Sequence, residues 1–248
     1  MKTYLWIVVV FVTATVGLFW SFGAGFRTLF EIALVVLGLV PAVVKATPRL
    51  YISWTKARFW IGNVSATWDL SIRFQKFAGD ATLNELVGHI QRRMIGTTIL
   101  VQSDVRAVLR TRRFVIEVSA QAAQMHMGLQ DPELALSIAP VTVGYRDSTR
   151  FLEQQLLPLI ESCRDALGAR WASYSLRVDL PEHNPYVGVY LQNIPLTPMQ
   201  EFRIQFALPD ATETKIVVGK ERLTVISDTL EQFRRAVGAA LAFRVPVR

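Results

Sequence analysis

The chain has 248 residues, of which 51% are apolar, and it carries a formal net charge of +7. This composition is too apolar for an average soluble protein and too polar for a transporter with many membrane spans. The single cysteine excludes an intrachain disulfide framework. The basic balance permits anionic partners, either lipid headgroups or nucleic acid, and does not choose between them.

The N-terminal part of the chain holds most of its continuous apolar sequence. From Tyr4 to Val44 the only charged residues are Arg27 and Glu31. A bilayer core is about 30 Å thick, and a helix needs about 20 residues to cross it. A run of 41 residues with a glycine-containing turn, SFGAGF, in its middle therefore predicts a two-helix transmembrane hairpin within residues 1–45. A cleaved signal peptide is disfavoured, because a second apolar run would remain.

Charged and aromatic residues flank the second predicted span. Arg27 and Glu31 stand four residues apart in its first turn, where they can face each other at the membrane interface. Beyond the span, residues 46–62 interleave aromatic with basic side chains and predict a juxtamembrane segment on the membrane surface. The residues expected to anchor the protein at the interface are Arg27, Glu31, Tyr51, Trp54, Lys56, Arg58 and Trp60.

Basic residues also predict the orientation of the hairpin. Lys2 precedes the first span, and Lys45, Arg49, Lys56 and Arg58 follow the second. Because cytoplasmic flanks carry an excess of Lys and Arg, both ends of the chain are expected in the cytoplasm. The expected location is the cell inner membrane, with the C-terminal domain on its cytoplasmic side.

Residues 63–248 predict a globular domain whose first half reads strand, helix, four strands, helix. SATWDLSIRFQ alternates apolar and polar residues as a half-buried strand does, and a capping box opens the helix at Thr82–Met94. A long helix should begin at Asp147 or Ser148, be interrupted by Pro158 and end at Gly168. The strands expected between the two helices are Val105–Arg110, Phe114–Gln121, Leu134–Ile138 and Val141–Tyr145.

The second half predicts more strands and a closing helix. This last helix should be capped by Asp228 and bury Leu230, Phe233, Val237 and Leu241. The expected strands are Ser173–Leu180, Tyr186–Asn193, Glu201–Leu208, Thr214–Val218 and Arg222–Ile226. Together the elements predict an α+β class, with an antiparallel sheet and helices on one of its faces.

Two pairs of segments fit an internal duplication, with halves 63–169 and 170–248, and the general similarity of short amphipathic strands is the alternative explanation. ATWDLSIRF matches ASYSLRVDL in its aromatic and alternating positions, and VTVGYRDSTRF matches LTVISDTLEQF in its strand, acidic cap, helix and Phe. The order of elements from Ala66 to Leu241 resembles the saddle of the TATA-binding protein in topology alone. A shared topology carries no function.

Few residues form a pattern typical of catalysis. The three histidines are scattered and have no metal-ligand spacing. Cys163 shares a helix face with leucines, which indicates a buried small hydrophobe. Asp179, Glu182 and His183 surround a proline, which is typical of a solvated hairpin turn rather than an acid/base group. No metal, no cofactor and no enzymatic activity are expected.

One basic cluster is a candidate contact surface for an anionic ligand or a partner protein. It holds Asp104 as its single acid and six arginines, which are Arg92, Arg93, Arg106, Arg110, Arg112 and Arg113. A solvated face or interface salt bridges would also explain it, and nucleic acid is not favoured because no aromatics interleave. The sequence favours a membrane-anchored subunit or scaffold acting through protein contacts, as a homo-oligomer or hetero-complex. A sensor that binds an anionic ligand (lipid headgroup, nucleotide or nucleic acid) is the alternative.

Overall fold

The computed structural model describes residues 48–75, 83–121, 133–181, 184–190, 201–208 and 211–241. The predicted hairpin, with Arg27 and Glu31, lies outside these residues. None of the helices within the described ranges is both long and apolar enough to cross a membrane. The contacts of the chain divide it into two units that meet after Ala57, within helix α3 (Pro48–Gly62). The second unit, which begins at Arg58, contains the whole sheet.

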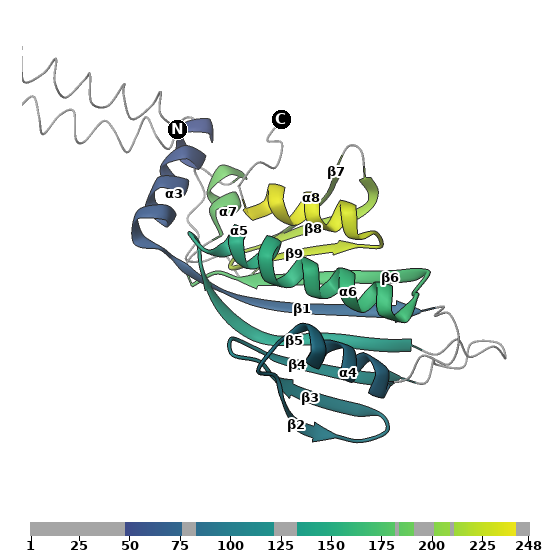
Figure 1. Ribbon diagram of the computed structural model, residues 1–248. Helices are drawn as coiled ribbons and strands as arrows, with labels where there is room; N and C mark the ends of the chain where they lie inside the picture. Colours follow the sequence, from purple (N-terminus) through teal and green to yellow (C-terminus); the bar gives the residue numbers. More distant parts are fainter. Residues whose placement is uncertain are drawn as a thin grey trace, which may run out of the picture. The chain divides into compact units, whose positions relative to one another are not determined.

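The described part of the chain forms a nine-stranded antiparallel sheet in the order β2-β3-β4-β5-β1-β6-β9-β8-β7 (Figure 1). Its long central strands pair across the middle, and its shorter strands lie toward the two edges. The bounds are β1 (Ser65–Gln75), β2 (Thr98–Gln102), β3 (Arg106–Arg110), β4 (Val115–Gln121), β5 (Glu133–Gly144), β6 (Trp171–Asp179), β7 (Arg203–Leu208), β8 (Ala211–Gly219) and β9 (Arg222–Ser227).

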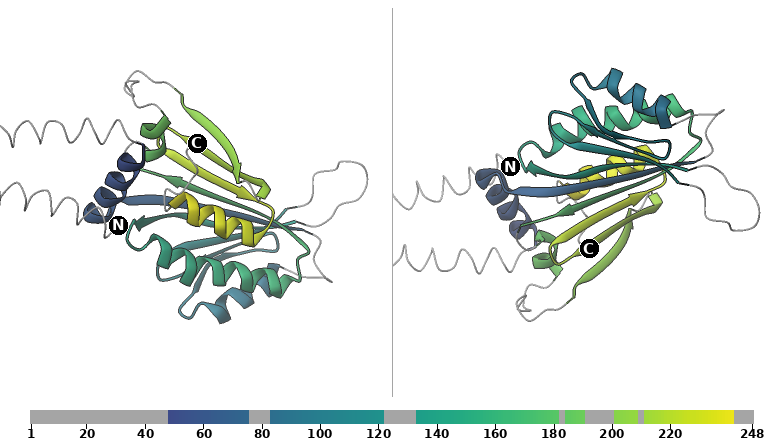
Figure 2. Two further views of the ribbon diagram at one scale, coloured as in Figure 1. Left: turned by 90° about the horizontal axis from the view of Figure 1, so that it is seen from above. Right: turned by 90° about the horizontal axis from the view of Figure 1, so that it is seen from below.

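The main helices cover one face of this sheet (Figures 1 and 2). The side chains of β1 that face them, Trp68, Leu70, Ile72 and Phe74, are all buried, whereas the alternate residues are more exposed. The alternation of apolar and polar residues in the sequence thus matches the alternation of buried and exposed side chains. The predicted α+β class with a large antiparallel sheet is confirmed. The helices are α4 (Leu83–Arg93), α5 (Ser148–Phe151), α6 (Leu157–Leu167) and α8 (Leu230–Leu241), with a short α7 (Pro185–Tyr190) near the end of β6.

The two halves of the sheet repeat one order of pairing. β1 pairs with the last strand of its half, β5, and β6 pairs likewise with β9; β1 and β6 then join the halves. In the first half Trp68 packs edge-on against Phe151, with ring centroids 5.6 Å apart. In the second half Tyr174 packs against Phe233 at 5.5 Å. These residues occupy matching positions in the two segment pairs, and the internal duplication itself stays a prediction.

The predicted interruption at Pro158 takes the form of a π-helical turn. Leu152–Leu156 forms this turn between α5 and α6, and the N–H of Leu157 donates to the carbonyl of Leu152. Pro158, which has no N–H to donate, directly follows this wider turn within one continuous helical run. Gly168 ends α6 with a φ of 56°, as a left-handed cap does.

One predicted strand is wrong. Residues 186–190, within the expected strand Tyr186–Asn193, form helix α7, while residues 191–193 lie outside the described residues. The side-chain Oδ1 of buried Asn184 accepts from the N–H of Tyr186 at 3.1 Å. Asn before Pro185 is thus an N-cap followed by a proline at the first helical position, and this signal prevails over the alternating pattern.

Other features of the fold differ from the prediction as well. The strands Leu134–Ile138 and Val141–Tyr145 are one strand, β5. β4 pairs with it only as far as Ile138, so Pro140 interrupts no hydrogen bond to β4. Strand β2 was not predicted. Helix α8 is capped by Thr229 rather than Asp228, because the N–H of Gln232 donates to its hydroxyl.

Candidate functional site

The free edge of strand β2 is the most exposed apolar feature of the described residues. All five residues of β2 are exposed, and β2 pairs on one side only, with β3. Ile95 is 87% exposed, Leu100 50% and Val101 52%, and Ile99 and Val105 are exposed as well. Large apolar side chains that crowd an unpaired strand are typical of an interaction surface.

The local sequence explains how β2 comes to lie at this edge. Helix α4 ends in a turn at Gly96, whose φ is 86°, and the chain enters β2 directly. Ile99 lies opposite Leu109 and Val101 opposite Val108, with a register shift at Leu100 between them. Leu109 is buried beneath the helices and Val108 faces the open side of the sheet. The edge therefore presents apolar side chains on both faces.

The six predicted arginines divide into two groups. Arg106, at the start of β3, forms an ion pair with Glu117 at 2.7 Å and stands apart. The other five lie around the start of β2: Arg112 lies against Gly96, with its Nε 3.5 Å from the position of an added Cβ, and Arg110 pairs with Thr98 in the sheet. We call these five residues the arginine group; they are Arg92, Arg93, Arg110, Arg112 and Arg113.

The arginine group is exposed and forms no ion pair with the described residues. Arg110, Arg112 and Arg113 lie at the β3–β4 turn, where the hydroxyl of Thr111 donates to the carbonyl of Phe114 and accepts from the N–H groups of Arg113 and Phe114. Arg92 and Arg93 lie in the last turn of α4, where Nε of Arg92 donates to the carbonyl of Gly88 at 3.2 Å. The side chains of the group are exposed on these two elements. An anion or an acidic side chain would meet no competing carboxylate there.

The predicted interfacial segment is helical, as α3, and its residues belong to both units. In the first unit Trp54 is exposed, and Tyr51 and Lys56 are half-buried. In the second unit Arg58 and Trp60 are exposed. Exposed tryptophan and basic side chains are the composition that the membrane interface favours, and the anchoring role stays a prediction.

Arg146, which the sequence did not single out, closes the C-terminal end of α3. Its guanidinium donates to the carbonyls of Trp60 at 2.6 Å and Ile61 at 2.8 Å, and stacks 4.8 Å from the centre of the Trp60 ring. Its N–H donates to the side chain of Asn63, a residue with a φ of 43°. Cations at a helix C-terminus satisfy its free carbonyls and its dipole. We call this arrangement the Arg146 clamp.

A small apolar cavity of about 30 Å³ lies beside the Arg146 clamp. Its walls include Phe59, Trp68, Tyr145, Val178 and Leu241. A cavity of this size has room for water-sized molecules and is much smaller than the volume of about 150 Å³ that holds a benzene ring.

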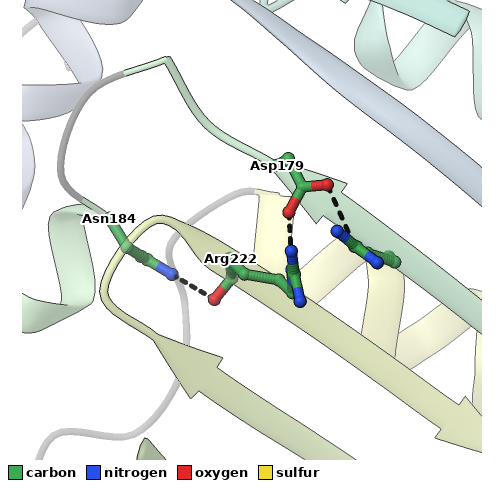
Figure 3. Close-up of polar contacts among 4 residues, drawn as sticks. Asp179, Asn184 and Arg222 are labelled. Carbon is green, nitrogen blue, oxygen red and sulfur yellow. Dashed lines mark hydrogen bonds and ion pairs between the residues drawn. The ribbon is translucent and has the colours of Figure 1, made fainter. Parts of the chain in front are cut away.

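The acidic group around Pro181 is neutralised where the structure describes it (Figure 3). Asp179 accepts from Nε of Arg222 at 2.6 Å and from Nε of Arg177 at 2.9 Å, while Asn184 donates to the carbonyl of Arg222. Two guanidinium groups hold this carboxylate, so it ties β6 to β9. Glu182 and His183 lie outside the described residues.

A His–Ser pair joins two helices on the covered side of the sheet. Nε2 of His89 on α4 lies 2.5 Å from Oγ of Ser162 on α6. Ser162 stands inside α6, where backbone N–H groups bond along the helix and cannot act as oxyanion donors. The pair therefore packs α4 against α6. Beside it in sequence, burial raises the pKa of the Cys163 thiol to about 12, which keeps it protonated and unreactive.

No group of three His, Cys, Asp or Glu residues that could hold a metal ion occurs in the described ranges. Comparison of the chain with protein-family models and with curated proteins finds no match. The strand edge and the arginine group are therefore interpreted from their own chemistry.

Proposed function

We propose that the protein is a membrane-anchored, non-enzymatic subunit or scaffold that works through protein–protein contacts of its α+β domain. The observation that carries this proposal is the β2 edge. Exposed strands recruit other chains by adding a strand, because the outward N–H and C=O groups are ready to pair. Exposed Leu100, Val101 and Val105 add apolar contact area to that backbone recognition.

The membrane part of the proposal is supported by the sequence. The apolar run Tyr4–Val44 suits two spans, and the basic residues on both sides favour cytoplasmic ends. We propose that the α+β domain faces the cytoplasm at the inner membrane. A reporter that is active only outside the cytoplasm, fused after Arg248, should be silent, and a strong signal would overturn the orientation.

The decisive experiment measures the mass of the full-length chain extracted from its own membranes in mild detergent. We expect a mass above that of the monomer, from companions that co-purify. A Val101→Glu variant should lose them, because a charge at the edge opposes strand addition. Ala207→Glu places the same charge on β7, at the opposite edge, and should keep them. A strict monomer in the unchanged chain would contradict the proposal.

The arginine group favours a second candidate function. In this alternative the domain binds an anionic ligand, which is a lipid headgroup, a nucleotide or nucleic acid, and responds as a sensor. Exposed guanidinium groups without ion pairs among the described residues are suited to phosphate. Changing Arg110, Arg112 and Arg113 to Ala should abolish binding of such probes without unfolding the chain. Unchanged binding would remove this candidate.

A further inference from the structure

We propose that the partner of the β2 edge is an extended segment of another protein, which adds as a further antiparallel strand and places acidic residues against the arginine group. This inference rests on the proposed function and specifies its partner. It names both the conformation and the charge pattern of the segment that binds.

The conformation follows from the edge itself. β2 uses one row of its backbone groups to pair with β3, and its opposite row has no neighbouring strand in the described sheet. An added strand would pair with this row, and its alternate side chains would reach Ile99 on the helix side and Val101 on the open side. A helix or a compact surface would leave these backbone groups unpaired.

The charge pattern follows from the asymmetry of the edge. The start of β2 carries the arginine group, whereas at its other end Arg106 is already paired with Glu117 and Asp104 adds a negative charge. The positive field is therefore confined to one end of the strand. Since neighbouring antiparallel strands run in opposite directions, the C-terminal end of the added segment meets the arginine group. We expect acidic residues at that end and apolar alternation before them.

A second copy of the chain satisfies this pattern poorly. If two β2 strands paired in antiparallel fashion, the C-terminal end of one β2 would meet the arginine group of the other copy. Near that end, Glu117 is already paired with Arg106. On β2 and the turn that follows it, Asp104 is the only acidic residue, and it would face five arginines. Such a dimer would use the apolar edge and leave most of the charge uncompensated.

A lipid surface also satisfies it poorly. Anionic headgroups suit the arginine group, but the apolar side chains stand on a strand with unpaired backbone groups. Such groups find no hydrogen-bond partner in hydrocarbon, which is unfavourable, so the edge favours a partner that pairs its backbone. The experiment below therefore includes binding to anionic lipid as one of its possible results.

The test uses the full-length chain in neutral phosphatidylcholine nanodiscs and short fluorescent peptides. The acidic probe has alternating Val and Thr residues followed by three acidic residues at its C-terminal end. In the neutral probe Asn and Gln replace the acids, and in the blocked probe N-methyl groups replace alternate N–H donors. We expect the acidic probe to bind about tenfold more tightly than the neutral one at low salt, with the difference shrinking as salt rises. The blocked probe should not bind.

Two variants locate the effect. Changing Arg110, Arg112 and Arg113 to Ala should reduce the affinity for the acidic probe to that of the neutral probe. Changing the exposed Arg150, Arg170 and Arg203 instead removes the same charge elsewhere and should preserve the difference. Val101→Glu should weaken both probes.

Four results would overturn the inference. Two of them concern the peptides: equal affinities for the acidic and neutral probes, or binding of the blocked probe. The third is a dimer of the chain that Val101→Glu dissociates. The fourth is binding to phosphatidylserine vesicles that is abolished in the triple variant at the arginine group. If companions still co-purify and depend on Val101 while the acidic probe shows no advantage, the inference fails and the proposed function stands. If no companions exist, the proposed function fails by itself.

Discussion

Removal of the Arg146 clamp should loosen the end of α3 without unfolding the sheet. Arg146→Ala deletes two hydrogen bonds from a charged donor and one cation–π contact. Hydrogen bonds to charged groups contribute about 1.5–3 kcal/mol each when buried, and an exposed cation–π contact about 0.5–1 kcal/mol. Because the guanidinium is exposed, solvent reduces these values. We expect a local loss of about 2 kcal/mol.

The assay is amide hydrogen exchange of the full-length chain in detergent micelles. The amides of Asn63 and Val64 bond to the carbonyls of Trp60 and Phe59, so they report opening of the last turn of α3. A loss of about 2 kcal/mol corresponds to exchange about 30-fold faster. Arg150→Ala, which removes a guanidinium bound to Gln154 at 3.0 Å within its own helical segment, is the matched control. Unchanged exchange at these amides in Arg146→Ala would refute the clamp.

Four further changes test the packing. Tyr186→Phe removes a buried hydroxyl that donates to the carbonyl of Ala240 at 2.8 Å, and urea unfolding should show a loss of about 1–2 kcal/mol. Burial raises the pKa of Cys163 to about 12, so the unfolded chain ionises first and stability should fall as pH rises from about 8.5 toward that value; Cys163→Ala should lack this part of the fall. Gly168→Ala forces a side chain into a φ of 56° and should lower stability by about 1 kcal/mol. Gly238→Ala, at an exposed helical site with open space, should raise stability by about 0.5–1 kcal/mol in the same urea unfolding assay.

Strong periodicity made most of the fold predictable. The alternation around Trp68 and the helical stripe of Leu230, Phe233 and Val237 identify the faces that are buried. Prediction failed where a local signal and a pattern disagreed: Asn184 and Pro185 start a helix in a segment that alternates like a strand. It also failed at β2, since an edge strand with every residue exposed has no burial period to recognise.

The candidate site was only partly predictable. The arginines could be counted along the chain, but which of them stand together depends on Gly96 turning the chain so that the β3–β4 turn and the end of α4 adjoin. The apolar run at residues 99–101 was a usable signal for the edge, because apolar residues soon after a helix end need a neighbour. Arg146 had no such signal, since its partners are backbone carbonyls more than eighty residues earlier.

The central pairing of β1 with β6 has a consequence for synthesis of the chain. The first half can close β1 onto β5 and pack Trp68 on Phe151 before Trp171 has been made. Until β6 has been synthesised and paired, the backbone groups on the other side of β1 have no partner strand. Nascent or truncated chains that stop short of Trp171 therefore expose the long unpaired edge of β1 and are prone to aggregate there, although the same edge is buried in the middle of the sheet in the complete protein.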